Sequence, residues 1–428
     1  MKQLLFLIIF VCSFQTAKAQ LYYPPLVGST WETTDPATLG WCQDSINSLY
    51  DFLEQTNSKA FIVLKNGKIV LEKYFGTFTV DSLWLWNSAG KTLTGFAVGI
   101  AQEEGYLSIN DTTSDYLGVG WTNLTPTQEE KITIRHQLTM TSGLADTGDI
   151  FCTDPACLNY MADPGTRWAY HNAPYTMLDG VIENATGLTL NQWVTQKIKV
   201  PTGMTGLFVP IDYNNIFVSN ARSMARFGLL MQSQGIWNGN PVLNDPAYFQ
   251  QMTTSSQAIN PSYGYLTWLN GQSSFMLPQS QFSFPGSPLS QAPADLYSAL
   301  GKNGQVINIS PSEGLVVVRM GDADGVSLVP VIYNDSIWAR INRLSCVSSV
   351  PESSLSHISV SPNPVSGNVV QLSRLTQDDS VTLTTLNGKS LEVTLNNQEL
   401  QLPQLASGVY LITINRFGEQ KTIRLLVN

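Results

Sequence analysis

The chain has 428 residues, of which 43% are hydrophobic and 13% are charged, and its formal net charge is −9. This length and hydrophobic fraction allow a large core and more than one domain. Because the balance is acidic and no basic stripe occurs, the sequence excludes a surface built to bind nucleic acid or anionic lipid.

The first 19 residues have the pattern of a secretory signal peptide. Lys2 precedes a short apolar run at residues 4–11, and Ala17-Lys18-Ala19 provides an A-x-A cleavage site. The run is too short to cross a membrane as a helix. We therefore expect residues 1–19 to be removed and the mature protein to leave the cytoplasm.

Four cysteines remain after this expected cleavage, namely Cys42, Cys152, Cys157 and Cys346. An even number in an exported protein favours disulfides over metal ligation. The nearest pair, Cys152 and Cys157, would close a small loop, and by elimination the second bridge would join Cys42 to Cys346. The alternative is four buried or free thiols.

Strand-like and helix-like patterns alternate from residue 30 to about residue 345. Two β-rich runs surround Asn66-Gly67 within residues 60–74, which predicts a hairpin. A helix is expected to follow Ser88 and to end at Gly105. Further helices are predicted at 175–184, 190–197, 220–234 and 336–344, and a second hairpin at 306–310 and 315–320. Strands near both ends with helices between them predict an α+β fold whose sheet is closed by distant segments.

The sequence changes character after residue 347. Residues 348–356 are rich in Ser and Pro, as expected of a linker, and residues 357–428 have an all-β pattern. Strands are predicted at 381–386, 391–395 and 408–414 and indicate a small β-sandwich without a catalytic constellation.

Ser88-Ala89-Gly90-Lys91 is the only S-x-x-K in the chain. A serine and a lysine three residues apart on a helix share one face, so the lysine amine can accept the serine proton. A serine needs such a base because its hydroxyl alone is a poor nucleophile. The alternative for Ser88 by itself is an ordinary helix N-cap.

Two more polar motifs follow in the chain: Tyr170-His171-Asn172 and Lys302-Asn303-Gly304. Each arises easily by chance, and Tyr170 taken alone has a core aromatic as its alternative. The chain has three histidines and no H-x-x-x-H spacing, so we expect no metal site and no cofactor.

The order and wide spacing of these three motifs resemble the serine β-lactamase and penicillin-binding-protein superfamily. The Y-x-N form of the middle motif resembles the class C branch with its esterases, D-alanyl-D-alanine peptidases and aminohexanoate-dimer hydrolases. Residues 132–144, 164–172 and 225–231 also resemble stretches of that family. The resemblance implies, over residues 20–347, a β-lactamase/transpeptidase-like antiparallel sheet flanked by helices, with an all-helical subdomain.

The resemblance also implies a role for each residue of the motifs. Ser88 would form an acyl-enzyme, with Lys91 as a base of depressed pKa and Tyr170 as the proton shuttle. Asn172 would position the substrate and Lys91, and Lys302 would hold the tyrosine or a substrate carboxylate.

The oxyanion donors would be the N–H groups of Ser88 and of Gln305, which follows Gly304. Asn303 stands where the family has threonine, which argues against efficient β-lactam hydrolysis. The irregular segment 273–295 is a candidate lid.

The tail resembles the type A sorting domain of the Bacteroidota type IX secretion system. The matching stretches are residues 358–364, 386–389, 405–412 and 421–427. The resemblance implies an address that the secretion machinery reads, and hence a secreted or cell-surface protein. The alternative is a carbohydrate- or protein-binding β-module.

These observations predict an exported serine hydrolase that cleaves small ester or amide bonds through an acyl-serine. The first alternative is a D-alanyl-D-alanine carboxypeptidase or a β-lactamase. The second is a catalytically silent binding protein on the same fold.

Overall fold

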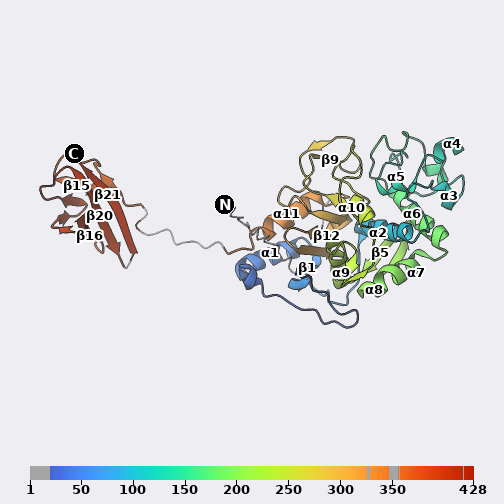
Figure 1. Ribbon diagram of the computed structural model, residues 1–428, viewed down its shortest axis with the longest axis horizontal. Helices are drawn as coiled ribbons and strands as arrows, with labels where there is room; N and C mark the ends of the chain where they lie inside the picture. Colours follow the sequence, from blue (N-terminus) through green and yellow to red (C-terminus); the bar gives the residue numbers. More distant parts are fainter. Residues whose placement is uncertain (1–19, 324, 326–327, 347–354, 356, 418) are drawn as a thin grey trace, which may run out of the picture. The chain divides into compact units, whose positions relative to one another are not determined.

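The computed structural model describes residues 20–323, 325, 328–346, 355, 357–417 and 419–428. The chain forms two compact units that separate after Cys346. The expected signal peptide, and all of the expected linker except Leu355, lie outside the described residues. Figure 1 traces both units.

An antiparallel sheet forms the centre of the first unit. The Asn66-Gly67 turn joins its first two strands, and both turn residues have the positive φ (49° and 85°) that a tight hairpin requires. The first strand of the chain also pairs with the strand at Leu315–Gly321, so segments far apart in sequence close the sheet as predicted. In order across the sheet, the six strands are β2 (Lys68–Tyr74), β1 (Ser58–Lys65), β13 (Leu315–Gly321), β12 (Gln305–Ser310), β11 (Tyr297–Gly301) and β8 (Trp268–Leu269).

Helices cover both faces of this sheet, which confirms the predicted fold class (Figure 1). On one face, α9 (Ala221–Gln232) packs so closely that a Cβ on Gly228 would lie 2.4 Å from Val316. On the other face lies α11 (Val331–Ile341), whose Asn334 donates a hydrogen bond to Asn308 at 2.9 Å, together with α1 (Gln43–Gln55). The sheet is therefore the middle layer of a sandwich.

The helix α11 begins at Val331, five residues before the predicted start. Val331, Ile332 and Tyr333 are β-branched or aromatic and have weak helix propensity, but packing of this segment against the sheet overrides that preference. The predicted lid, residues 273–295, contains a short hairpin of β9 (Ser274–Phe275) and β10 (Phe284–Pro285). Phe275 and Phe284 stack across it at 5.3 Å between ring centroids.

A helical subdomain lies beside the sheet, around the buried helix α2 (Gly90–Glu103) (Figure 1). Its other elements are α3 (Ser114–Leu117), α4 (Pro126–Glu129), α5 (Ile134–Leu138), α6 (Asn172–Thr186), α7 (Leu190–Val194) and α8 (Val200–Thr202). A three-stranded sheet of β3 (Trp84–Leu85), β5 (Asn214–Ser219) and β4 (Leu207–Ile211) adjoins it. The first unit also contains β6 (Ile236–Trp237), β7 (Asn240–Pro241) and α10 (Pro246–Thr253).

Both expected disulfides are bonded in the structure. Cys42, directly before α1, is joined to Cys346, which follows α11. This bridge links the two helices on one face of the sheet. The second bridge joins Cys152 to Cys157 and closes a loop near the helical subdomain.

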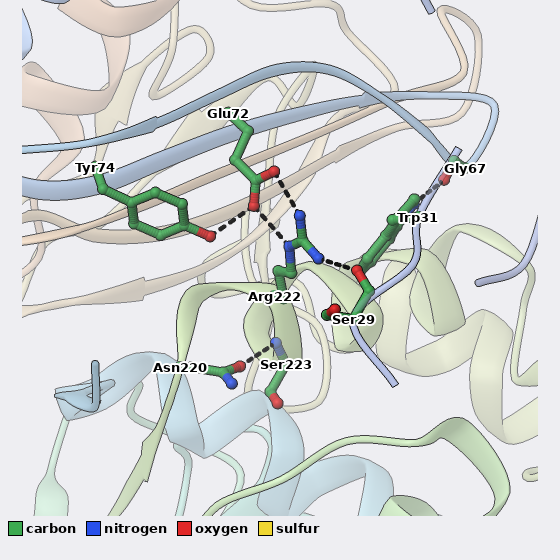
Figure 2. A network of polar contacts seen from close by, with 8 residues as sticks. All are labelled: Ser29, Trp31, Gly67, Glu72, Tyr74, Asn220, Arg222 and Ser223. Carbon is green, nitrogen blue, oxygen red and sulfur yellow. Dashed lines mark hydrogen bonds and ion pairs between the residues drawn. The ribbon is translucent and has the colours of Figure 1, made fainter. Parts of the chain in front are cut away.

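A network of polar contacts ties the second strand to the start of α9 (Figure 2). Arg222 binds both oxygens of Glu72, at 2.7 and 2.8 Å, and the Tyr74 hydroxyl donates to the same carboxylate at 2.6 Å. Arg222 also donates to the carbonyl of Ser29. Asn220 caps α9 by accepting a hydrogen bond from the Ser223 amide at 2.8 Å. The N-terminal segment, the sheet and the helix are thus fastened at one place.

The second unit is a β-sandwich, as predicted. One sheet contains β14 (Val360–Ser361), β15 (Val369–Leu372), β19 (Glu399–Gln401) and β18 (Thr394–Asn396). The other contains β17 (Ser390–Leu391), β16 (Ser380–Thr385), β20 (Gly408–Arg416) and β21 (Glu419–Val427). The single strand expected at 391–395 is instead two strands in different sheets, because the chain crosses between the sheets after Leu391. No helix in the described part of the chain is both long and apolar enough to cross a membrane.

Candidate active site

Ser88 lies in a tight 3₁₀ turn, Asn87–Ala89, that runs directly into α2. Asn87 adopts a left-handed conformation (φ 49°), which asparagine tolerates better than most residues. Its side-chain amide donates to the carbonyl of Lys302 at 2.9 Å. At Gly301 a Cβ would lie only 2.4 Å from the Trp86 carbonyl oxygen. The end of β11 is therefore pressed against the turn that presents Ser88.

Lys91 and Ser88 are in contact. Lys91 Nζ lies 2.9 Å from Ser88 Oγ and donates a 2.5 Å hydrogen bond to Asn172 Oδ1. Lys91 is 2% exposed, whereas Ser88 is only partly buried. A buried amine thus stands behind a serine hydroxyl that solvent and substrate can reach.

Burial lowers the pKa of Lys91 well below the value of 10.5 for a free lysine. The lowering agrees with the sequence-based expectation, although burial alone accounts for it, without a like charge from Lys302. A neutral amine is able to accept a proton from the serine hydroxyl, whereas an ammonium is not.

Two tyrosines surround the lysine. Its Nζ lies 4.1 Å from the ring centroid of Tyr175 and 5.1 Å from that of Tyr170. Burial raises the pKa of Tyr170, and the nearby Ser88 hydroxyl reduces that rise. Trp268 and Tyr263 pack against the Tyr170 ring, at 5.6 and 6.3 Å between centroids, and explain its burial.

Tyr175 was missed by the sequence analysis as a residue of the site. It lies three residues after Asn172 on α6, so the two side chains share one face of that helix. The signal was therefore present in the sequence: an aromatic residue one turn after the Y-x-N motif.

A cavity of about 410 Å³ opens over these groups. The residues that line it are Asn87, Ser88, Lys91, Asp149, Phe151, Tyr170, Asn172, Tyr175, Ile211, Asp212, Tyr213, Asn214, Ile216, Lys302 and Leu328. A larger hollow of about 840 Å³ lies beside α10 and β8, but its lining contains no serine–lysine pair. We therefore assign the smaller cavity as the candidate active site.

The third motif departs from expectation. Lys302, Asn303 and Gly304 form the turn between β11 and β12, and of the three only Lys302 lines the cavity. Asn303 is instead hydrogen-bonded to Asp322 at 2.7 Å, and Gly304 packs against Arg319 and Tyr333.

Gln305 is fully buried and donates to the carbonyl of Gly321 at 2.6 Å. Neither Gly304 nor Gln305 belongs to the cavity lining. The spacing of K-x-G could not reveal this, because it does not determine where β11 ends and the turn begins.

Trp86 and His136 have structural roles. Trp86 is buried and donates to Ser219 Oγ at 2.8 Å, and His136 accepts a hydrogen bond from the Thr133 amide at 3.1 Å. Burial lowers the pKa of His171 to about 4. His171 and segment 273–295 are absent from the lining of the cavity in the described structure.

One buried carboxyl group lies behind the site. Asp179 follows Tyr175 by one turn of α6, is 6% exposed, and accepts a 2.9 Å hydrogen bond from Asn215 on β5. Burial raises its pKa to about 7, against the effect of Asn215 and with a further contribution from Glu183. Asn214, next to its partner, lines the cavity.

The family model described as "Beta-lactamase" matches residues 51–326, which contain all of the cavity except Leu328. The chain belongs to this family. The model described as "Secretion system C-terminal sorting domain" matches residues 359–428, so this beta-lactamase family member carries a sorting domain that indicates export.

Individual proteins are similar to this chain in sequence or in fold. An uncharacterized protein of Alkalihalophilus pseudofirmus is 24% identical over 66% of this chain and 88% of its own length. A penicillin-binding protein homologue from Pyrococcus abyssi matches in structure with a TM-score of 0.52 and 17% identity, over 89% of this chain and 99% of that chain. A family VIII carboxylesterase matches with a TM-score of 0.54 and 13% identity, over 74% and 99%. At these identities the structural likeness establishes the fold alone.

Proposed function

We propose that this beta-lactamase family member hydrolyses small esters or amides through a covalent acyl intermediate on Ser88. The observation that carries the proposal is the 2.9 Å contact between Ser88 Oγ and the buried Nζ of Lys91. Because burial lowers its pKa, a larger share of Lys91 is neutral and able to act as the base than for an exposed lysine.

In the first half of the reaction, Ser88 Oγ attacks the substrate carbonyl carbon while its proton passes to Lys91 Nζ. The carbonyl oxygen becomes an oxyanion, and collapse of this intermediate expels the alcohol or amine. The leaving group takes a proton from the Tyr170 hydroxyl, which is replenished from Lys91. The raised pKa of Tyr170 suits this role because the phenol stays protonated at neutral pH.

In the second half, water attacks the acyl-serine and gives its proton to Lys91 through Tyr170. The bond between the acyl carbon and Ser88 Oγ then breaks, Ser88 Oγ takes the proton back from Lys91, and the carboxylic acid leaves. Asn172 holds the amine in line by accepting its 2.5 Å hydrogen bond. Lys91 and Tyr170 therefore transfer the protons, and Asn172 positions Lys91.

The oxyanion needs two N–H donors near Ser88. One is the amide of Ser88, at the positive end of α2. For the second we propose the amide of Lys302 in place of Gln305, because Lys302 directly follows Gly301, where β11 meets the Ser88 turn.

The runner-up is a D-alanyl-D-alanine carboxypeptidase or a β-lactamase, which the family and the penicillin-binding structural relative keep open. Those substrates carry a carboxylate, and Asn303, the residue at the threonine position, is held by Asp322 away from the cavity. This favours the ester or amide hydrolase.

Intact-mass labelling of the full chain with a fluorophosphonate tests the proposal. We expect one label on the wild type, none on Ser88→Ala, and one on the control Ser82→Ala. Hydrolysis of a p-nitrophenyl ester, a chromogenic cephalosporin and a D-Ala-D-Ala peptide then separates the candidates. Folded protein that takes no label and hydrolyses none of the three would instead be a silent binding protein.

We propose that residues 1–19 direct the chain out of the cytoplasm and that the type IX machinery reads the C-terminal unit, with the product secreted or held at the cell surface. The sorting-domain match supports this. Fractionation of cells that make either the full chain or a chain ending at Cys346 tests it, and equal export of the two would refute it.

A further inference from the structure

Two segments form most of the cavity wall that the catalytic residues do not supply. One is the segment that ends at the Cys152–Cys157 disulfide loop; its residues Asp149 and Phe151, just before the loop, line the cavity. The other is the tight turn between β4 and β5, which contributes Asp212 and Tyr213. The Tyr213 hydroxyl donates to Asp154 Oδ2 at 3.3 Å, so the two segments touch. We call this part of the wall the acidic mouth.

The carboxylates of the acidic mouth are not neutralised. Asp149, Asp154 and Asp212 are exposed, and none of them forms an ion pair with any described residue. Asp154 and, more weakly, Asp149 raise the pKa of Tyr213, which places both negative charges near its hydroxyl. The lining also contains two lysines, Lys91 and Lys302, and the Lys302 carbonyl accepts a hydrogen bond from Asn87 beside Ser88.

The aromatic side chains of the acidic mouth are exposed as well. Phe151 is 37% exposed and Tyr213 is 39% exposed, although large apolar side chains are usually buried. Asp149 is fixed next to Phe151 because its Oδ1 accepts a hydrogen bond from the Phe151 amide at 2.9 Å. Aromatic faces beside carboxylates bind ammonium groups through charge and cation–π attraction, and they repel anions.

We propose that the substrates of Ser88 carry a positively charged ammonium group, which binds at the acidic mouth between Phe151 and Tyr213 and beside Asp149 and Asp212. The inference rests on the proposed hydrolase function and names the substrate class for that site. It assigns recognition to a cation, where the resemblance to the penicillin-binding proteins implied a carboxylate held by Lys302.

Three p-nitrophenyl esters of matched length test the charge preference with the full chain. Their acyl groups are heptanoyl (neutral), 6-aminohexanoyl (positive) and adipoyl (negative), compared at pH 7.5, where the amine is protonated. We expect kcat/KM for the positive ester to exceed that for the neutral one about tenfold, and to exceed that for the negative ester by more. The preference is expected to fall at 0.5 M salt because exposed charges are screened.

In the double variant Asp149→Asn with Asp212→Asn, kcat/KM for the positive ester is expected to lie within about twofold of kcat/KM for the neutral ester. Asp51→Asn removes one exposed carboxylate outside the cavity lining and is expected to keep the tenfold ratio. A preference for the neutral or negative ester, or a ratio that survives the double substitution, overturns the inference while Ser88-dependent hydrolysis stands. Absence of hydrolysis of all three esters counts against the proposed function itself.

Discussion

Lys91 Nζ is 2.9 Å from Ser88 Oγ and is almost completely enclosed, with only 2% of the residue exposed. The contact is local, since the two residues are three apart, but the enclosure comes from distant segments. Asn172 and Tyr175 on α6 and the aromatic cluster around Tyr170 surround the amine. An accessible Ser88 hydroxyl therefore lies next to a buried Lys91 amine, and the first prediction concerns the pH dependence of this pair.

The rate of ester hydrolysis is expected to rise with pH and then level off. Its acid limb reports Lys91, whose pKa burial lowers well below 10.5, because only the neutral amine accepts the serine proton. Lys91→Met is expected to reduce kcat/KM about 10³-fold, and Lys68→Met, at an exposed site, to leave it unchanged. The measurement is kcat/KM for a neutral p-nitrophenyl ester from pH 5 to 9. A rate that falls steadily with pH would contradict the assignment.

The backbone at the end of β11 is expected to matter more than the Lys302 side chain. Gly301→Ala places a methyl group 2.4 Å from the Trp86 carbonyl oxygen and must displace the strand or the Ser88 turn. We expect it to lower kcat about 10²-fold, as loss of one oxyanion donor does. Lys302→Met retains the backbone amide and is expected to lower kcat for a neutral ester by less than about tenfold. The reverse ranking would return Lys302 to the electrostatic role implied by the resemblance.

Asp179 is expected to make the protein less stable as pH rises through about 7. Its carboxyl is protonated in the folded state below that pH, whereas the unfolded carboxyl ionises near 3.8, so the folded state binds more protons between these values. Asp179→Asn removes this ionisation and keeps an oxygen that can accept from Asn215.

We expect Asp179→Asn to be more stable than the wild type at pH 8, on the order of 4 kcal/mol, and close to it at pH 4. Urea unfolding at the two pH values measures the difference. An equal change at both would mean that ionisation of Asp179 is not the cause.

The contact between Glu72 and Arg222 is expected to stabilise the first unit (Figure 2). Burial alone would raise the pKa of Glu72, but hydrogen bonds from Arg222 and Tyr74 lower it overall. Arg222→Met leaves this partly buried carboxylate without its partner and is expected to cost about 2 kcal/mol at pH 7.

Because the pKa of Glu72 is lowered, its contribution is present at neutral pH and disappears as pH falls through the folded-state value. The matched control is Lys131→Met, which removes a partner of Asp163 from a pair whose side chains are about half exposed, and it is expected to cost less than about 0.5 kcal/mol. Thermal unfolding of the three proteins at pH 7 and pH 3 compares them, and equal losses for both variants would contradict the expectation.

Much of the fold was predictable because its signals are local. The Asn66-Gly67 hairpin, the helix after Ser88 and the β-rich tail each depend on residue types within a short window, and the structure has all three. Predictions failed where packing overrides the local preference. The start of α11 is one such place, and the division of residues 391–395 between two sheets is another.

The candidate site was predictable to a similar degree. Its residues Ser88, Lys91, Tyr170 and Asn172 belong to motifs that the sequence displays, and all four line one cavity. Tyr175 was missed although helical spacing pointed to it. The position of Gln305 was not predictable, because the end of β11 is decided by its pairing with β12 and its contact with the Ser88 turn.

The sequence by itself determined the family, the sorting domain, the serine–lysine spacing and the candidate cysteine pairs, because each is written in residue types at short range or in a pattern shared with relatives. Only the tertiary structure decided that Lys91 is buried, that Lys302 rather than Gln305 lines the cavity, and that carboxylates without an ion pair to any described residue lie at its mouth. The physical reason is that desolvation and electric potential depend on atoms from segments far apart in the chain. No local sequence pattern specifies which of these segments come into contact.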